Sequence, residues 1–275
     1  MPVDDFDPAA FRKLEHDGWN ALYAGYHDHW AHLTPQIIPE LLRQTAVGVG
    51  KRVLDIASGP GYVAGAAAAA GADVSGIDLA ENMRQLAAAN YPDVSFQLGD
   101  AEDLPFDDQA FDVVLINFGI LHFPNADVAL TEAFRVLRVG GRLGFTAWAA
   151  AADSAIGIAM KAIEQEGSLE VDLPKGTPTF RFADHAECAE VLARAGFADI
   201  TSTDIMLSWR LPAPDALMSS FRQATARISA LLGAQDPDHL PAIADAMAQG
   251  CAPYVGAEFT EMPMPAVLTC ATKAA

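Results

Sequence analysis

The chain has few cysteines, no long apolar segment and few basic residues. Its three cysteines, Cys188, Cys251 and Cys270, are widely spaced and match neither a disulfide framework nor a CxxC metal motif. We therefore expect buried free thiols. The longest apolar runs are rich in alanine and shorter than the ~20 residues that cross a bilayer, which predicts no membrane span.

The shortage of basic residues makes the chain strongly acidic. Lysine and arginine number 17 against 36 aspartates and glutamates, a formal net charge of -19. Such a charge repels a phosphate backbone, so we expect no nucleic-acid partner and favour a small or neutral substrate. The acidic start MPVDDFDPAAF does not resemble a secretory signal, and the expected location is cytoplasmic.

Residues 51–148 alternate short apolar runs with helical stretches, a pattern typical of a parallel sheet covered by helices on both faces. The predicted strands are residues 52–57, 73–78, 94–98, 111–117 and 142–148. The predicted helices between them are residues 61–70, 80–90 and 126–137.

The flanking segments are mainly helical in prediction. We expect an N-terminal helical cap at residues 1–46, a core at 47–149, and the rest of the sheet with helical insertions at 150–275. The insertions are expected to form a lid on the same domain, because no repeat or long linker separates them. Predicted helices in the flanks are residues 8–26, 35–45, 152–166, 184–195, 215–232 and 237–249, and predicted strands are 200–207 and 267–272.

A glycine turn follows the first predicted strand in VLDIASGPG, which ends at Gly61. Glycines in such a turn let backbone amides approach a ligand at a helix N-terminus, although a turn of this kind can also simply connect strand to helix. The second strand ends at Asp78, which can bind ribose hydroxyls or merely cap a helix. The third is followed by Asp100 and Glu102, so carboxylates of consecutive strands gather at one edge.

The ordered motifs VLDIASGPG, GIDLAENM, GDAEDLPFDDQAFDVVLINFGILHF and EAFRVLRVGGRLGFTAW resemble class I methyltransferases that use S-adenosylmethionine (SAM). The resemblance covers about residues 47–148 and is to the methyltransferase type 11 group, related to the C-methylating enzymes of ubiquinone and menaquinone biosynthesis. It implies a Rossmann-like α/β fold with a seven-stranded, mostly parallel sheet whose last strand is antiparallel. One departure is Ala57, where the D-x-G-x-G-x-G pattern has its first glycine.

The same resemblance implies a set of cofactor-binding residues. The glycine turn would hold the methionine end of SAM, Asp78 the ribose, Leu79 and Met83 the adenine face, and Asp100 with Ala101 the adenine edge. Asn117 would offer its backbone carbonyl to the SAM amino group. The full predicted set is Tyr26, Thr34, Asp55, Ala57, Gly59, Gly61, Asp78, Leu79, Met83, Asp100, Ala101, Glu102 and Asn117.

Two histidine patterns have competing interpretations. His122 follows the fourth strand in GILHF and is a candidate general base, or equally a histidine that packs or caps after the strand. His27, His29 and His32 could suggest a metal cluster, but their spacing lacks a helical i, i+4 pair, so no metal is expected. The aromatic residues Tyr23, Trp30, Trp148 and Trp209 fit either an apolar acceptor pocket or the core.

The expected function is SAM-dependent transfer of a methyl group to an oxygen, nitrogen or carbon atom of a small molecule, with S-adenosylhomocysteine (SAH) as product. Two alternatives stay open: a non-catalytic SAM-binding protein and an NAD(P)-dependent oxidoreductase. The second is disfavoured because the turn lacks a full G-x-G-x-x-G. A homodimer is compatible with the sequence.

Overall fold

The computed structural model describes residues 6–274, which divide into two compact units. Unit 1 comprises the chain up to Leu33 together with Ala150–Lys175 and Met206–Pro265. Unit 2 comprises Thr34–Ala149, Gly176–Ile205 and the chain from Ala266 onward. The predicted division follows the order of the chain, whereas each unit is assembled from three separate segments.

Unit 2 is built on a sheet with the order β3-β2-β1-β4-β5-β7-β6. The pairs β3–β2, β2–β1, β1–β4 and β4–β5 are parallel, and β7 is antiparallel to β5. The predicted seven-stranded sheet with an antiparallel last strand is therefore confirmed. The strands are β1 (Arg52–Ile56), β2 (Asp73–Asp78), β3 (Ser95–Leu98), β4 (Phe111–Asn117), β5 (Leu137–Trp148), β6 (Phe197–Leu211) and β7 (Thr260–Lys273).

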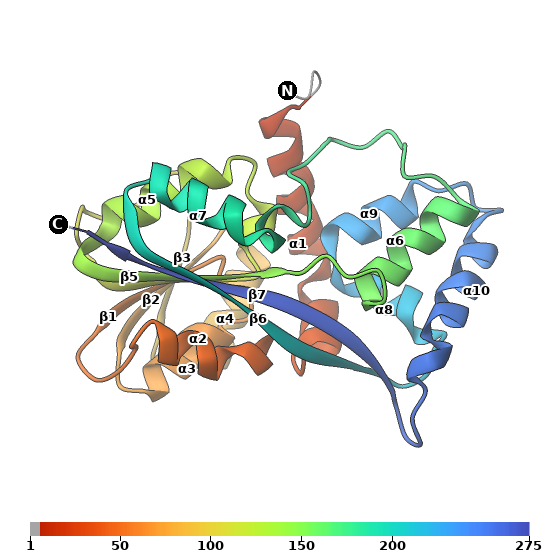
Figure 1. The fold of residues 1–275 in the computed structure, drawn as a ribbon, viewed down its shortest axis with the longest axis horizontal. Coiled ribbons are helices and arrows are strands. Elements are labelled where there is room, and N and C mark those ends of the chain that lie inside the picture. The colour runs from red at the N-terminus through yellow and green to blue at the C-terminus, as the bar shows by residue number, and fades with distance from the viewer. Residues whose placement is uncertain (1–5, 275) are drawn as a thin grey trace. The chain divides into compact units, whose positions relative to one another are not determined.

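Apolar runs place β1 and β4 at the centre of this sheet. Val53, Leu54 and Ile56 in β1 are almost fully buried, as are four consecutive residues of β4, Val113 to Ile116. Side chains alternate between the two faces of a strand, so a continuous apolar run requires cover on both faces. Figure 1 shows this cover, with α5 and α7 on one face and α2 and α3 on the other.

Along the chain, α2 precedes β1, and the other helices of unit 2 alternate with its strands. In α5, Ala126, Ala129, Leu130, Ala133 and Val136 follow helical spacing and pack into the main hydrophobic cluster. The helices are α2 (Ile38–Gln44), α3 (Tyr62–Ala69), α4 (Glu81–Asn90), α5 (Ala126–Val136) and α7 (His185–Arg194), with short 3-10 turns η1 (Thr34–Ile37), η2 (Ile120–His122) and η3 (Arg181–Ala183).

Unit 1 is mainly helical. Helix α1 packs against α8 and α9, and α10 packs against α6 and α8. An aromatic cluster fills the interior, in which the Trp30 and Trp209 rings lie 5.1 Å apart between centroids and Phe221 contacts both. The elements are α1 (Pro8–Trp30), α6 (Ala155–Glu166), α8 (Ala216–Ala224), α9 (Ala226–Gly233), α10 (Leu240–Cys251) and the turn η4 (Ala252–Tyr254).

Several element boundaries differ from the predictions. The single helix expected at 215–232 is two helices, because Thr225 adopts an extended conformation (φ -136°, ψ 121°) and its hydroxyl donates to the Phe221 carbonyl. Such local bonding of a threonine competes with helix propagation. Strand β5 begins at Leu137, where the helix was expected to end, and β6 and β7 both extend beyond their predicted ranges.

Two expectations from composition can be compared with the structure. Cys188, Cys251 and Cys270 are free and buried, as predicted, and burial raises the pKa of each thiol. Among residues 6–274, no helix is both long and apolar enough to cross a membrane.

Candidate functional site

The carboxyl ends of β3, β2, β1 and β4 meet at one edge of the unit 2 sheet, because these strands are parallel neighbours. Ligands of open α/β sheets bind at this edge. All but one of the predicted cofactor-binding residues belong to unit 2, and most follow these four strands. The exception is Tyr26, which belongs to unit 1.

The turn after β1 has a left-handed backbone at three positions. Ala57, Gly59 and Gly61 have φ of 54°, 51° and 85°. Left-handed backbone suits glycine, whereas Ala57 adopts it against the preference of its methyl group. The turn closes through a hydrogen bond from the Gly61 amide to the Ser58 carbonyl, 2.9 Å long, and α3 begins at the next residue.

The two glycines of this turn have different surroundings. A Cβ added to Gly59 would meet no atom within 4 Å, so open space lies over this residue. A Cβ added to Gly61 would lie 2.9 Å from the Tyr91 ring and 3.0 Å from the Phe96 ring. Gly59 therefore leaves room for a ligand against the backbone. Gly61 instead permits the start of α3 to pack closely on Tyr91 and Phe96.

Asp55 lies beneath the turn and is almost fully buried. Its carboxyl accepts a hydrogen bond from the Ala64 amide, 3.0 Å long, and so caps α3, whose N-cap residue Gly61 has no side chain. Burial raises the pKa of Asp55 to about 8, the hydrogen bond from Ala64 opposes this shift, and the charge of Asp78 adds to it. Asp55 is thus a buried carboxyl that stays protonated at neutral pH.

Asp78 connects the ends of β1 and β2. One carboxylate oxygen accepts from the Gly59 amide and the other from the Ala80 amide, each at 2.8 Å. Burial raises the pKa of Asp78, while hydrogen bonds from the Ala80, Gly59 and Leu79 amides and the charge of His122 act in the opposite direction. His122 is therefore within electrostatic range of Asp78. With three amides on about four lone-pair sites, the carboxylate keeps some acceptor capacity for a ligand.

The predicted adenine-binding residues follow β2 and β3. Met83 in α4 and Ala101 are buried, while Leu79 is half-buried. The Asp100 carboxylate accepts from the Glu102 amide at 2.9 Å. The Glu102 carboxylate accepts from the backbone and side-chain amides of Asn125, at 2.7 and 3.1 Å, and therefore holds the start of α5.

Side-chain hydrogen bonds hold the end of β4 against neighbouring segments. The Asn117 amide oxygen accepts from the Thr146 hydroxyl at 2.8 Å, and its NH₂ group donates to the Thr34 carbonyl at 3.3 Å. The structure thus brings the predicted residues Thr34 and Asn117 together. Thr146 also accepts from the Phe118 amide at 2.8 Å.

Phe118 begins the loop that carries His122. It has φ of 56°, unusual for a bulky residue, and its ring stacks on Trp148 with centroids 3.8 Å apart. Strained backbone of this kind persists only where the surroundings hold it in place, and it is frequent at functional sites. Farther along the loop, His122 is half-buried in η2, and the Thr177 hydroxyl donates to the Leu121 carbonyl at 3.0 Å.

The unit 1 aromatics proposed as acceptor-pocket residues lie largely in its core. Trp30 and Trp209 are buried, and the Trp209 indole donates to the His29 carbonyl at 3.0 Å. Tyr26 stacks on Trp30 with centroids 6.0 Å apart, and its predicted role toward the cofactor stays a prediction. Tyr23 is half-buried.

The histidines near the end of α1 have partners within unit 1. The His29 ring contacts the Ser220 hydroxyl at 3.3 Å, and the His32 ring contacts the Arg210 carbonyl at 3.2 Å. Within the part of the chain that the structure describes, no group of three or more histidine, cysteine, aspartate or glutamate side chains is placed to hold a metal ion.

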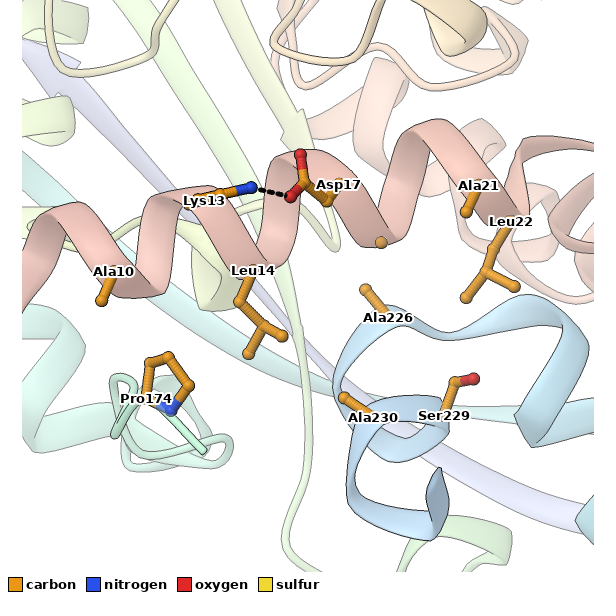
Figure 2. Close-up of a pocket in the computed structure, with 11 residues that line it drawn as sticks. Ala10, Lys13, Leu14, Asp17, Ala21, Leu22, Pro174, Ala226, Ser229 and Ala230 are labelled. Carbon is orange, nitrogen blue, oxygen red and sulfur yellow. Dashed lines mark hydrogen bonds and ion pairs between the residues drawn. The ribbon is translucent and has the colours of Figure 1, made fainter. Parts of the chain in front are cut away.

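Unit 1 also contains an open groove of about 510 Å³ between α1 and α9 (Figure 2). Its polar groups are few: Lys13 and Asp17 form an ion pair, and the Ser229 hydroxyl donates to the Arg222 carbonyl. The remaining surface is apolar. The lining residues are Ala10, Lys13, Leu14, Asp17, Gly18, Ala21, Leu22, Pro174, Ala226, Ser229 and Ala230.

Sequence reasoning missed several residues that shape the sheet edge. Ser58 is buried, and its hydroxyl has no hydrogen-bond partner within the described residues. Phe118 and Thr146 fix the end of β4, and Gly119 packs against Ala57. The one available signal was position, since Ser58 lies inside the glycine turn and Phe118 and Gly119 directly follow Asn117.

Residues 54–145 match a family profile described as a methyltransferase domain. Over 100 aligned residues, the chain is 42% identical to a demethylmenaquinone methyltransferase of Renibacterium salmoninarum. The aligned segment covers 36% of this chain and 42% of that protein. The chain thus spans about two fifths of the length of the curated relatives it matches.

Solved structures with the same fold extend beyond this domain. A phosphoethanolamine N-methyltransferase 2 of Haemonchus contortus, solved with phosphomonomethylethanolamine and SAH, aligns with a TM-score of 0.55 at 18% identity, covering 87% of this chain and 53% of that one. The [4+2]-cyclase SpnF aligns with a TM-score of 0.52 at 21% identity, covering 88% and 81%. At these identities the likeness establishes the fold alone.

Proposed function

We propose, from the premise that residues 54–145 are a methyltransferase domain, that this protein binds SAM and transfers its methyl group to an oxygen, nitrogen or carbon atom of a small molecule. The observation that carries the proposal is the open space over Gly59, next to the Asp78 carboxylate. A nucleoside cofactor needs both features: close approach to a backbone turn and an acceptor for its ribose hydroxyls.

The residues at the sheet edge fit SAM. The Asp78 carboxylate keeps some acceptor capacity beyond its bonds to backbone amides, and the buried Ser58 hydroxyl lacks a partner within the described chain. Asp55 and the turn of Ala57, Gly59 and Gly61 would border the methionine part. The remaining predicted contacts are Tyr26, Thr34, Leu79, Met83, Asp100, Ala101, Glu102 and the Asn117 carbonyl.

When bound, SAM supplies an activated methyl group on a sulfonium, so the protein's own task is alignment and exclusion of water. The loop Phe118 to Phe123 is suited to this task, because most of it is buried and its backbone is tied to Thr146 and Thr177. His122 is our candidate for the base that takes a proton from the acceptor.

For the acceptor we propose a small molecule with an apolar part and no strong negative charge. The net charge of -19 disfavours anions, and in the loop that carries His122 the apolar Phe118 ring stacks on Trp148. The relatives point to no single class, since one is named for a menaquinone precursor and a fold neighbour was solved with a phosphorylated amine.

Calorimetric titration with SAM, SAH and NADH tests the cofactor assignment. We expect micromolar binding of SAM and SAH, none of NADH, and loss of SAH binding in Asp78→Ala. Asp107→Ala, which removes an exposed acid from the same domain, should bind SAH like the wild type. Binding of NADH in place of SAH would contradict the proposal.

Methyl transfer itself needs a separate test. Radiolabelled SAM incubated with a set of apolar phenols, amines and quinols should yield a labelled product. Tight SAH binding without turnover on any acceptor would favour a non-catalytic SAM-binding protein, an alternative that a cyclase with the same fold keeps relevant.

A further inference from the structure

The backbone conformation of Gly119 does not require glycine. Its φ of -84° and ψ of -32° suit any residue. A Cβ at this position would lie 2.7 Å from the Ala57 Cβ and 3.2 Å from the Ile116 Cγ2. The nearest obstacle is therefore the methyl group of Ala57, which belongs to the turn after the neighbouring strand β1.

Ala57 is unusual for the complementary reason. Its φ of 54° is left-handed, a conformation that glycine adopts without the steric cost of a Cβ. The resemblance described above places a glycine at this position of the turn. The chain thus has a methyl group where the backbone favours glycine, and a glycine where the backbone would accept a methyl group.

Ala57 and Gly119 lie where the turn after β1 meets the loop after β4, the two segments of the proposed methionine site. Ala57 belongs to the turn that includes Gly59, while Gly119 lies between the Asn117 carbonyl and His122 and accepts from the His122 amide at 2.9 Å. The loop is held on its other sides by Thr146 at Phe118 and by Thr177 at Leu121. Contact with Ala57 limits its approach to the β1 turn.

We propose that Ala57 and Gly119 are a matched pair of positioning residues, whose single methyl group sets the spacing between the β1 turn and the loop that carries His122. This inference rests on the proposed SAM site, because the spacing matters for function only if the ligand contacts both segments. The methyl group can reside on either residue, but not on both.

A double-mutant cycle tests the pair with Ala57→Gly, Gly119→Ala and the exchanged variant Ala57→Gly/Gly119→Ala. Gly119→Ala should weaken SAH binding at least about tenfold, because overpacking displaces the loop by a fraction of an ångström. The exchanged variant should bind within about fivefold of the wild type, whereas Ala57→Gly, which leaves no methyl group between the two segments, should bind SAH more weakly than the exchanged variant. Gly48→Ala is the matched control, because a Cβ there meets no atom within 4 Å.

Thermal unfolding of the same proteins separates this inference from the cofactor assignment. Gly119→Ala should lower Tm by about 3–10 °C relative to Gly48→Ala, and the exchange should recover most of the loss. If the wild type fails to bind SAH, the proposed function is wrong, yet the Tm cycle still tests the pairing. If Gly119→Ala does not fold, the exchanged variant, which should fold and bind, decides the question.

Two results would overturn the positioning role. One is a Gly119→Ala protein that binds SAH as the wild type does, even with a lowered Tm, since the contact would then serve packing alone. The other is an exchanged variant that binds no better than Gly119→Ala, since the Ala57 methyl group would then not be the obstacle.

Discussion

The two units of this chain use their side chains differently. At the carboxyl edge of the unit 2 sheet, Asp55, Asp78 and Asn117 bond to backbone groups of neighbouring turns and leave open space over Gly59. In unit 1, the largest side chains are withdrawn into a core around Trp209. In unit 2, polar groups surround the open space over Gly59, whereas in unit 1 aromatic side chains fill the core.

This difference shows which residues can be assigned a role from the sequence alone. The polar groups of unit 2 lie at or near the carboxyl ends of strands, so their position in sequence determines their position at the sheet edge. The unit 1 core joins residues far apart in the chain, such as Trp30 and Trp209. We therefore expect substitutions in unit 2 to change cofactor binding and those in unit 1 to change stability.

The largest expected effect concerns stability. Trp209→Ala removes a fully buried indole and its hydrogen bond to His29, which should lower the free energy of unfolding by about 3–5 kcal/mol. Urea denaturation measures this change, and the SAH affinity of the folded variant should remain within about threefold of the wild type. A large loss of SAH affinity in the folded protein would break the comparison between the units.

The next effect concerns ligand binding in unit 2. Asp78→Ala removes the proposed acceptor of the ribose hydroxyls and the bonds to Gly59 and Ala80. Hydrogen bonds to charged groups contribute about 1.5–3 kcal/mol each, so SAH affinity should fall at least about 100-fold. Calorimetry measures the affinity, and an unchanged value would remove Asp78 from the site.

Most of the fold was predictable because its signals are local. Apolar runs identified β1 and β4, and glycine turns marked where strands end, whereas the seven-stranded sheet with its antiparallel last strand was implied by the family resemblance. The break at Thr225 was not, because a threonine that bonds to a carbonyl four residues earlier is compatible with either outcome. The long β6 and β7 strands depend on pairing between distant segments, which periodicity within one segment cannot predict.

The candidate site was predictable in outline but not in its contacts. Asp78 and Gly59 could be placed at the sheet edge from their positions after strands. That Glu102 holds Asn125, and that Asn117 bonds to Thr146 and Thr34, depends on side-chain directions in three dimensions. The different roles of Gly59 and Gly61 likewise appear only once Tyr91 and Phe96 are in place.

Gly59→Ala sharpens the comparison with a smaller effect. The added methyl group enters the open space and meets the left-handed backbone, so SAH affinity should fall about 10- to 30-fold, or about 1.4–2 kcal/mol. Gly140→Ala is the matched control, since Gly140 also has a positive φ of 75° and open space around it. Both variants should lose similar stability, and only the first should lose SAH affinity; equal affinities would place the ligand elsewhere.

The smallest effect, counted per pH unit, is a pH dependence of stability that originates from Asp55. Its pKa is about 8 in the folded chain, against about 3.9 for an unfolded aspartate. Between these values the folded state keeps a proton that the unfolded state has lost, so this group's stabilising contribution is complete below about pH 4 and is lost as the pH rises through about 8.

Asp55→Asn isolates this contribution, because asparagine imitates the protonated carboxyl and can still accept from the Ala64 amide. The free energy of unfolding of the wild type, measured in urea from pH 5 to 8, should fall relative to that of the variant by up to about 1.4 kcal/mol per pH unit. Parallel curves for the two proteins would mean that Asp55 is ionised in the fold. Asp55 would then count, with Asp78, among the charged groups of the sheet edge. The polar edge of unit 2 would extend one residue layer deeper into the fold than the pKa of about 8 implies.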